Sequence, residues 1–142
     1  MVVVGVDGSD EAKAALRFAL EEASLRGATL RIVHVWTLPT APGAFGIAAP
    51  PSADYLEHLR AEAERVVDHV LSEVPAGDRP PIERRVVQGA PSPVLIEASQ
   101  DADLLVVGSR GRGGFAGLLL GSVSQQCAHH ATCPVVIVRG QA

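Results

Sequence analysis

The chain has 142 residues and a formal net charge of −4, with 47% hydrophobic and 20% charged residues. These proportions are ordinary for one globular domain, and a chain of this length buries roughly two-thirds of the surface that its unfolded form exposes. The acidic balance argues against nucleic acid or an anionic membrane as the main partner. No run approaches the roughly 20 apolar residues of a membrane span, and no secretory leader is recognisable. We therefore expect a single cytoplasmic domain over residues 1–142.

The first part of the chain predicts a strand, a helix and a second strand. Residues 2–6 form an unbroken apolar run, which is typical of a strand buried on both faces. Apolar residues then recur at helical spacing over 11–23, after the N-cap candidates Ser9 and Asp10. Residues 30–35 predict the second strand.

Residues 37–53 are rich in proline, glycine and alanine and match neither a helix nor a strand. A loop of this length in a compact domain is usually functional or mobile. Its apolar residues Phe45 and Ile47 fit a lid over a ligand, and they equally fit ordinary packing. Both interpretations stay open.

The second part of the chain continues the alternation of helices and strands. Residues 56–74 carry the apolar stripe of a long amphipathic helix, and residues 82–87 predict a third strand near the sheet edge. The remaining predicted elements are a short helix at 94–98, a buried strand at 104–107, a helix at 121–131 and a last strand at 135–138.

This order predicts an α/β fold, with an open parallel sheet, helices on both faces and right-handed crossovers. Such sheets bind ligands beyond the carboxyl ends of their strands, at the point where the strand order reverses. Asp7 follows the first predicted strand and Gly108 follows the fourth. We therefore expect both residues to border one crevice.

The glycine-rich segment after the strand at 104–107 is the main functional signal. Gly108 and Gly111 follow this strand, and Gly121 and Ser122 open the next helix after nine further residues. Glycine lets a backbone approach a ligand closely, and a helix N-terminus offers N–H groups and partial positive charge. The sequence therefore predicts a phosphate cradle.

Three side chains near this segment have more than one interpretation. Ser122 can donate to a phosphate through its hydroxyl and its N–H group. Arg110 and Arg112 can add charge-assisted hydrogen bonds or remain solvated. Asp7 suits ribose hydroxyls or a metal ion, although an aspartate here can also simply cap the following turn.

Two common nucleotide motifs are absent from the sequence. A Walker A loop needs a lysine after its second glycine, and none stands near Gly121. A dinucleotide fingerprint needs its glycines directly after the first strand, where the chain reads Gly5-Val6-Asp7-Gly8-Ser9 instead.

The spacing Gly108-x-x-Gly111, nine residues, Gly121-Ser122 resembles the ATP-binding signature of the universal stress protein family. The chain resembles that family at four further places, in order: Val6-Asp7-Gly8-Ser9, Val33-His34-Val35, Val87-Gln88-Gly89 and Cys133-Pro134-Val135-Val136. This resemblance covers the whole chain. It implies a Rossmann-like sheet, of the adenine nucleotide alpha hydrolase-like type, with strand order 3-2-1-4-5. It also implies a homodimer through the last strand, Val135 to Val138, as an exposed apolar edge would favour.

The resemblance further implies which residues bind ATP. The residue matching Asp7 contacts the ribose or the nearby phosphates, and backbone groups near Val6, Val35 and Val107 line the adenine pocket. The residues expected to hold the ribose and phosphates, with Arg110 beside them, are Gly108, Gly111, Gly121, Ser122 and Val123.

Catalytic machinery is not evident in the sequence. Hydrolysis needs a group that positions water, and the segment offers none unless Asp7 holds water or a nucleotide-bound Mg²⁺. His129 and His130 are adjacent, so on a helix they point about 100° apart. His34, His58 and His69 lack ligand spacing, and Cys127 and Cys133 are most simply two buried thiols, with a redox pair or a metal site as the alternative.

The sequence therefore predicts an ATP-binding regulatory or sensor module of the stress response, with at most slow hydrolysis and an unidentified protein partner. The alternative is a dimerising interaction module of the same fold that binds AMP, cyclic AMP or no nucleotide.

Overall fold

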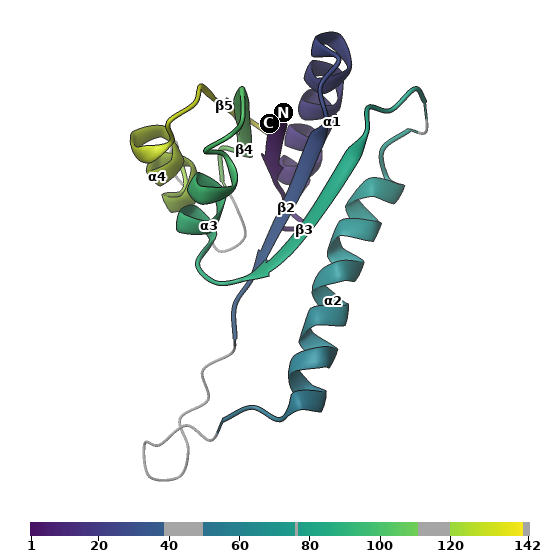
Figure 1. Cartoon of the computed structure of the whole chain (residues 1–142), viewed down its shortest axis with the longest axis vertical. Coiled ribbons are helices and arrows are strands. Elements are labelled where there is room, and N and C mark those ends of the chain that lie inside the picture. Colours follow the sequence, from purple (N-terminus) through teal and green to yellow (C-terminus); the bar gives the residue numbers. More distant parts are fainter. Residues whose placement is uncertain (39–49, 76, 111–119, 141–142) are drawn as a thin grey trace.

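The computed structural model describes residues 1–38, 50–75, 77–110 and 120–140. Its strands form one parallel sheet in the order β3-β2-β1-β4-β5, with helices on both sides (Figure 1). The strands are β1 (Val2–Gly5), β2 (Leu30–Trp36), β3 (Ile82–Gln88), β4 (Leu104–Gly108) and β5 (Val135–Val138). The helices are α1 (Asp10–Arg26), α2 (Ala53–Ser72), α3 (Pro91–Ala98) and α4 (Ser122–His130). The predicted α/β class and the strand order are confirmed.

Two apolar cores enclose the sheet, one on each face. Alternate residues of a strand point to opposite faces, so Val2 and Val4 of β1 join the core under α1 and α2, whereas Val3 joins the core under α3 and α4. All three side chains are fully buried. This two-sided burial explains why the central strands are unbroken apolar runs.

The helix starts follow local capping signals. Ser9, one of the two predicted caps, is the N-cap of α1, and its hydroxyl accepts from the Ala12 N–H at 3.1 Å. Helix α2 begins at Ala53, before the predicted start at residue 56, because Ser52 caps it through the Tyr55 N–H. The possible lid falls largely on residues 39–49, which lie outside the described residues.

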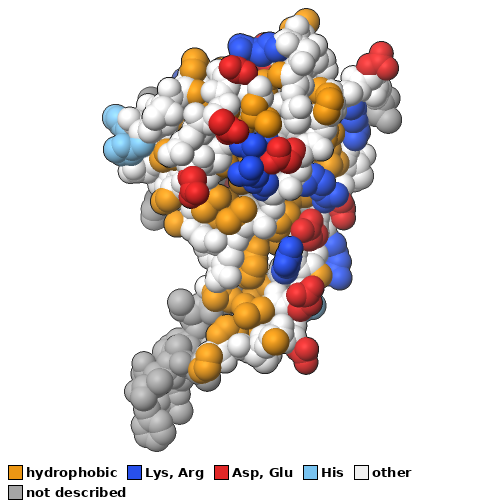
Figure 2. All heavy atoms as spheres, viewed as in Figure 1, with side chains coloured by type: hydrophobic (Ala, Val, Ile, Leu, Met, Phe, Trp, Pro, Cys, Tyr) orange, Lys and Arg blue, Asp and Glu red, His pale blue; other side chains and the backbone are white. Residues whose placement is uncertain are grey.

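The two edges of the sheet differ in composition. β3 is one edge strand, as predicted, and it carries three consecutive charged residues, Glu83, Arg84 and Arg85. β5 is the other edge strand and is entirely apolar, and each of its residues is partly exposed. On the face shown in Figure 2, acidic and basic side chains are intermixed rather than gathered by sign. Within the described ranges, no helix combines the length and the apolarity that crossing a membrane requires.

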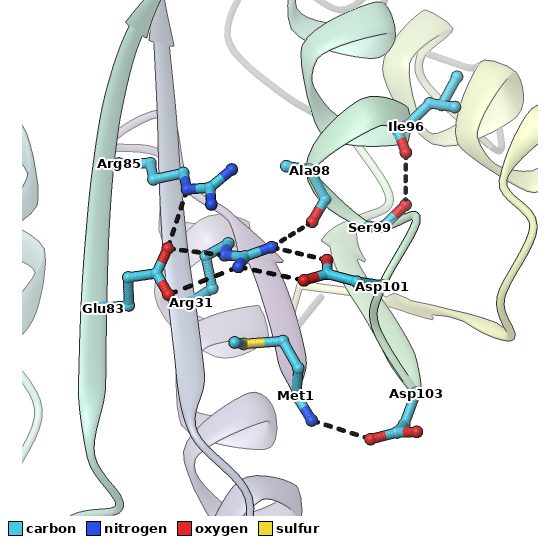
Figure 3. Close-up of polar contacts among 9 residues, drawn as sticks. All are labelled: Met1, Arg31, Glu83, Arg85, Ile96, Ala98, Ser99, Asp101 and Asp103. Atoms are coloured by element: carbon cyan, nitrogen blue, oxygen red, sulfur yellow. Dashed lines mark hydrogen bonds and ion pairs between the residues drawn. The ribbon is translucent and has the colours of Figure 1, made fainter.

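A buried arginine joins three elements at the amino end of the sheet (Figure 3). The Arg31 side chain of β2 is 5% exposed. Its Nε donates to Glu83 Oε1 of β3 at 2.9 Å. Its Nη1 donates to the Ala98 carbonyl at 2.7 Å and to Asp101 Oδ1 at 2.9 Å. Arg31 therefore ties β2 to β3 and to the turn that follows α3.

The Arg31 guanidinium lowers the pKa values of the two carboxylates that it contacts, Glu83 and Asp101. The hydrogen bond from Arg31 holds the pKa of Glu83 below its ordinary value of 4.5, and it likewise lowers the pKa of Asp101 from 3.8. A carboxyl group whose pKa is lowered by folding stabilises the native state above its unfolded pKa. That stabilisation is lost as the pH falls through the folded pKa.

We expect Arg31→Met to lower the free energy of unfolding by about 1–3 kcal/mol near neutral pH, because the Ala98 carbonyl loses its donor. The variant should also lose less stability than the wild type between about pH 6 and about pH 3, since Arg31 no longer lowers the pKa values of Glu83 and Asp101. Urea unfolding across this pH range measures both effects. Arg60→Met, on the exposed face of α2, is the charge-matched control. Parallel pH profiles for Arg31→Met and the wild type would contradict this account.

Candidate functional site at the carboxyl ends of β1 and β4

The strand order reverses between β1 and β4. From β1 the chain passes through α1 to β2 on one side, whereas β4 leads through α4 to β5 on the other. The two strands are paired in register, with Val4 opposite Val106. Their carboxyl ends therefore meet at one edge, with Asp7 after β1 and the glycine-rich segment after β4. A parallel sheet binds ligands at such a place.

Asp7 lies in a tight turn before α1. Its Oδ1 accepts from the Ser9 N–H at 3.0 Å and from the Ser9 hydroxyl at 2.6 Å. Ser9 Oγ in turn accepts from the first turn of α1. The structure thus shows the turn-capping contacts that the sequence left open for Asp7, and they fix its carboxylate at the carboxyl end of β1.

Ser109, directly after β4, connects three other elements. Its N–H donates to the Val138 carbonyl at the end of β5 at 2.8 Å. Its carbonyl accepts from the Gly121 N–H at 2.6 Å and from the Ser124 hydroxyl at 2.9 Å. Its own hydroxyl donates to Glu11 Oε2 of α1 at 2.9 Å. Ser109 is 3% exposed, so these bonds form in a largely water-free environment.

Glu11 also contacts the next residue of the segment. Its Oε2 accepts from the Arg110 N–H, and its Oε1 lies 3.6 Å from Arg110 Nε. The Glu11 side chain is 16% exposed, whereas that of Arg110 is 45% exposed. The first turn of α1 therefore holds the start of the glycine-rich segment through one carboxylate.

Two glycines make room for this carboxylate. A Cβ atom on Gly108 would lie 3.1 Å from Glu11 Cβ, and one on Gly140 would lie 2.8 Å from Glu11 Cγ. At Gly108 the missing side chain thus permits close packing of α1 on β4. The glycine spacing predicts close approach of the backbone to a ligand, and the packing of Glu11 is a second reason for a glycine at position 108.

The predicted binding residues with apolar side chains differ in how deeply they are buried. Val6 and Val107 are 4% and 3% exposed and their side chains belong to the cores, so they offer only backbone groups to a ligand. Val35 and Val123 are partly buried against the core under α3 and α4. Gly111 lies outside the described residues, as does Arg112.

Helix α4 presents its N-terminus at this edge. Gly121 is its N-cap and has no side chain to accept a hydrogen bond, and Ser122, the first helical residue, is exposed. The first N–H groups of a helix have no acceptor within the helix itself. Together with the helix dipole, they favour an anion at this position.

A buried histidine lies beside the first strand. His34 of β2 is 8% exposed, and its Nδ1 lies 2.8 Å from the Val6 carbonyl. Because a carbonyl oxygen only accepts, Nδ1 carries the proton. His34 therefore fixes the backbone just before Asp7, a contact that the sequence did not predict.

The remaining chemical groups lie away from this edge. Burial raises the pKa of the Cys127 thiol to about 11, and neighbouring Cys133 contributes, which disfavours a reactive thiolate near neutral pH. His129 and His130 are both exposed at the end of α4. In the described part of the chain, no group of three histidine, cysteine or acidic residues could hold a metal ion.

Glu11, Ser109 and Ser124 are the site residues that sequence reasoning missed. Glu11 appears in the sequence as an ordinary acidic residue in the first turn of a helix, and Ser109 as a loop residue. Their contact spans 98 positions, so no local pattern contains it. A serine three residues after a helix cap is a weak signal for Ser124, because it also fits a solvated face.

Comparisons with known proteins agree with this geometry. The model of the universal stress protein family matches residues 1–139. A universal stress protein of Mycolicibacterium smegmatis (strain ATCC 700084 / mc(2)155) is 41% identical in an alignment 144 residues long, gaps included, that covers 97% of this chain and 45% of that protein. The chain thus spans about half the length of the curated relatives it matches.

Solved structures show the same fold. The universal stress protein UspA from Lactobacillus plantarum superposes with a TM-score of 0.75 at 22% identity, over 97% of this chain and 96% of that one. A universal stress protein in complex with cAMP superposes with a TM-score of 0.66 at 32% identity, over 99% of this chain and 97% of that one. The family match, its glycine spacing and the five-stranded sheet agree, and this chain belongs to the universal stress protein family.

Proposed function

We propose that this chain binds an adenine nucleotide, ATP with Mg²⁺, in the crevice beyond the carboxyl ends of β1 and β4. In this role it acts as a nucleotide-dependent regulatory or sensor module of the stress response in the cytoplasm, read by a protein partner. The observation that carries the proposal is the set of bonds at Ser109, which brings the start of the glycine-rich segment to the N-terminus of α4. The related structure that contains cAMP supports an adenine nucleotide as the ligand.

The residues present fit such a ligand. The exposed Ser122 and the N-terminal N–H groups of α4 suit phosphate oxygens, with Val123 N–H among them. Asp7 suits ribose hydroxyls from the carboxyl end of β1. We propose that the backbone at Val6, Val35 and Val107 lines the adenine pocket, where the Val6 carbonyl already accepts from His34. We assign the rest of the phosphate cradle to Gly108, Arg110, Gly111 and Gly121, of which Gly111 lies outside the described residues.

The same residues favour binding over rapid hydrolysis. Phosphoryl transfer to water needs a group that orients the water and charges that stabilise the transition state. Asp7 is bonded to its own turn, and Glu11 is bonded to Ser109 and Arg110. We propose that Mg²⁺ enters with the nucleotide phosphates, with Asp7 as the nearby carboxylate, and that turnover is slow at most.

Calorimetric titration of nucleotide-stripped protein with ATP, with and without Mg²⁺, tests the proposed function. We expect a dissociation constant in the micromolar range and no binding heat for Gly121→Val, because a branched side chain at the buried N-cap blocks the approach of phosphate.

The matched control is Gly77→Val. Gly77 has open space around its Cβ position and lies in the α2–β3 connection, at the opposite end of the sheet. This variant should bind ATP as the wild type does. Unchanged affinity in folded Gly121→Val, or no binding of any adenine nucleotide to the wild type, would overturn the proposal.

The edge strand β5 favours a second role as a dimerising module. Pro134 and Val138 direct their carbonyl groups to β4. Because backbone groups alternate in direction along a strand, Val135 and Ile137 direct theirs to the free edge. A partly exposed apolar edge of this kind invites pairing with another copy. If the crevice binds AMP, cyclic AMP or no nucleotide, dimerisation is the main role of the chain. Mass spectrometry of the ligand retained through purification distinguishes this role from ATP binding.

We expect the wild type to sediment as a dimer and Ile137→Pro to sediment as a monomer that retains its circular dichroism spectrum. Proline at this position removes an outward-facing N–H group and leaves the ladder with β4 intact. Arg84→Pro places the same change at an outward-facing position of the other edge strand, β3, and should leave the dimer unchanged. A monomeric wild type, or a dimer that survives Ile137→Pro, would contradict pairing through β5.

A further inference from the structure

Glu11 places a negative charge at the start of the proposed phosphate cradle. Its carboxylate bonds the Ser109 hydroxyl and the Arg110 N–H, and Ser109 is in turn bonded to the N-cap of α4. One residue therefore separates this carboxylate from the helix end that we assign to the phosphates.

The position of this charge is fixed. The Glu11 stem passes between Gly108 and Gly140, where a Cβ atom on either residue would crowd it. Its carboxylate has backbone and hydroxyl donors besides the Arg110 side chain, and it is largely buried. Glu11 cannot swing away from an approaching anion without losing these bonds.

Arg110 is the natural counter-charge for phosphate at this edge. Its guanidinium is 45% exposed, and Nε lies 3.6 Å from Glu11 Oε1. While this contact persists, the Glu11 carboxylate partly neutralises the Arg110 charge, so Arg110 attracts phosphate less strongly.

We propose that Glu11 is a specificity-determining residue that reduces the gain in affinity from each added phosphate. It acts through its own fixed charge and through its hold on Arg110. The inference rests on the proposed nucleotide binding in the same crevice. Glu11 thereby shifts the preference of the site toward adenosine and AMP and away from the polyphosphates ADP and ATP.

The charge of Glu11 can be separated from its role as a tether. Glutamine has the same length and keeps one oxygen that can accept from Ser109 and Arg110, but it carries no charge. If Glu11 acts only as a tether, Glu11→Gln changes the affinity for every ligand by the same factor. If its charge matters, the effect grows with the number of phosphates and shrinks as salt screens the charges.

Calorimetric titrations of the nucleotide-stripped full chain with adenosine, AMP, ADP and ATP make this distinction. For Glu11→Gln we expect the ratio of ATP to adenosine affinity to rise about three- to tenfold at low salt. The rise should fall toward unity in roughly 1 M salt. The control is Asp10→Asn in the same turn, whose side chain is 99% exposed and ion-paired with Lys13. It should change the ratio by less than about twofold.

Each outcome is decisive. Equal changes for all four ligands would overturn the inference and leave the proposed function standing. Binding of none of them to the wild type would overturn both. Should Glu11→Gln fail to fold, as thermal unfolding would reveal, Glu11→Ala replaces it. That variant also removes the charge and frees the Arg110 guanidinium, so the ratio of ATP to adenosine affinity should rise, and an unchanged or lower ratio would overturn the inference.

Discussion

The carbonyl group of Ser109 is the point on which the arrangement of this crevice depends. It accepts from the N-cap of α4 and from the Ser124 hydroxyl, and it does so at a buried position. These hydrogen bonds fix the N-terminus of α4 against the end of β4, together with the packing of Val123 and Cys127 in the core that also contains Val107. A helix N-terminus favours an anion, and these bonds place that N-terminus at the end of β4, where the proposed binding site lies.

The other bonds of Ser109 extend the same constraint to the rest of the sheet. Its N–H continues the β4–β5 ladder to Val138, and its hydroxyl meets Glu11 at the start of α1. The turn at Asp7 caps that same helix. Structures on both sides of the strand-order reversal are therefore joined through one residue. The opposite end of the sheet has an analogous tie in Arg31, which joins β2, β3 and the turn after α3.

The sequence was sufficient to predict the fold because its signals are local and mutually consistent. The apolar runs at Val2 and Leu104 indicate buried strands, and Ser9 marks a helix start, so the order of elements follows directly. Boundaries shifted where a cap competed with the apolar pattern, as at Ser52. The strand order required the family resemblance, because local signals do not determine which strands are neighbours.

The sequence and the family resemblance point to the glycines of the candidate site, to Asp7, Arg110 and Ser122, and to four valines, but not to Glu11, Ser109 or Ser124. The glycines and Asp7 indicate a tight loop between a strand and a helix, and the spacing of residues in the sequence is enough to reveal such a loop. Glu11 and Arg31 are charged residues whose partners lie at distant positions in the chain, so their roles appear only after folding. An arginine in an apolar strand and a glutamate in a first helical turn both have ordinary local explanations, and these explanations conceal the tertiary contact.

The most direct test of the account is a titration of isotopically labelled protein with ATP and Mg²⁺, followed through its backbone amide NMR signals. The account predicts that the largest shifts fall on Ser109, Arg110 and the residues from Gly121 to Val123. A groove of about 690 Å³ between α1 and the α2–β3 connection, lined by Leu25 and Arg79 among others, serves as the internal reference and should remain unperturbed. Saturable shifts confined to that groove, with the signals around Ser109 unchanged, would contradict the placement of the nucleotide at the ends of β1 and β4.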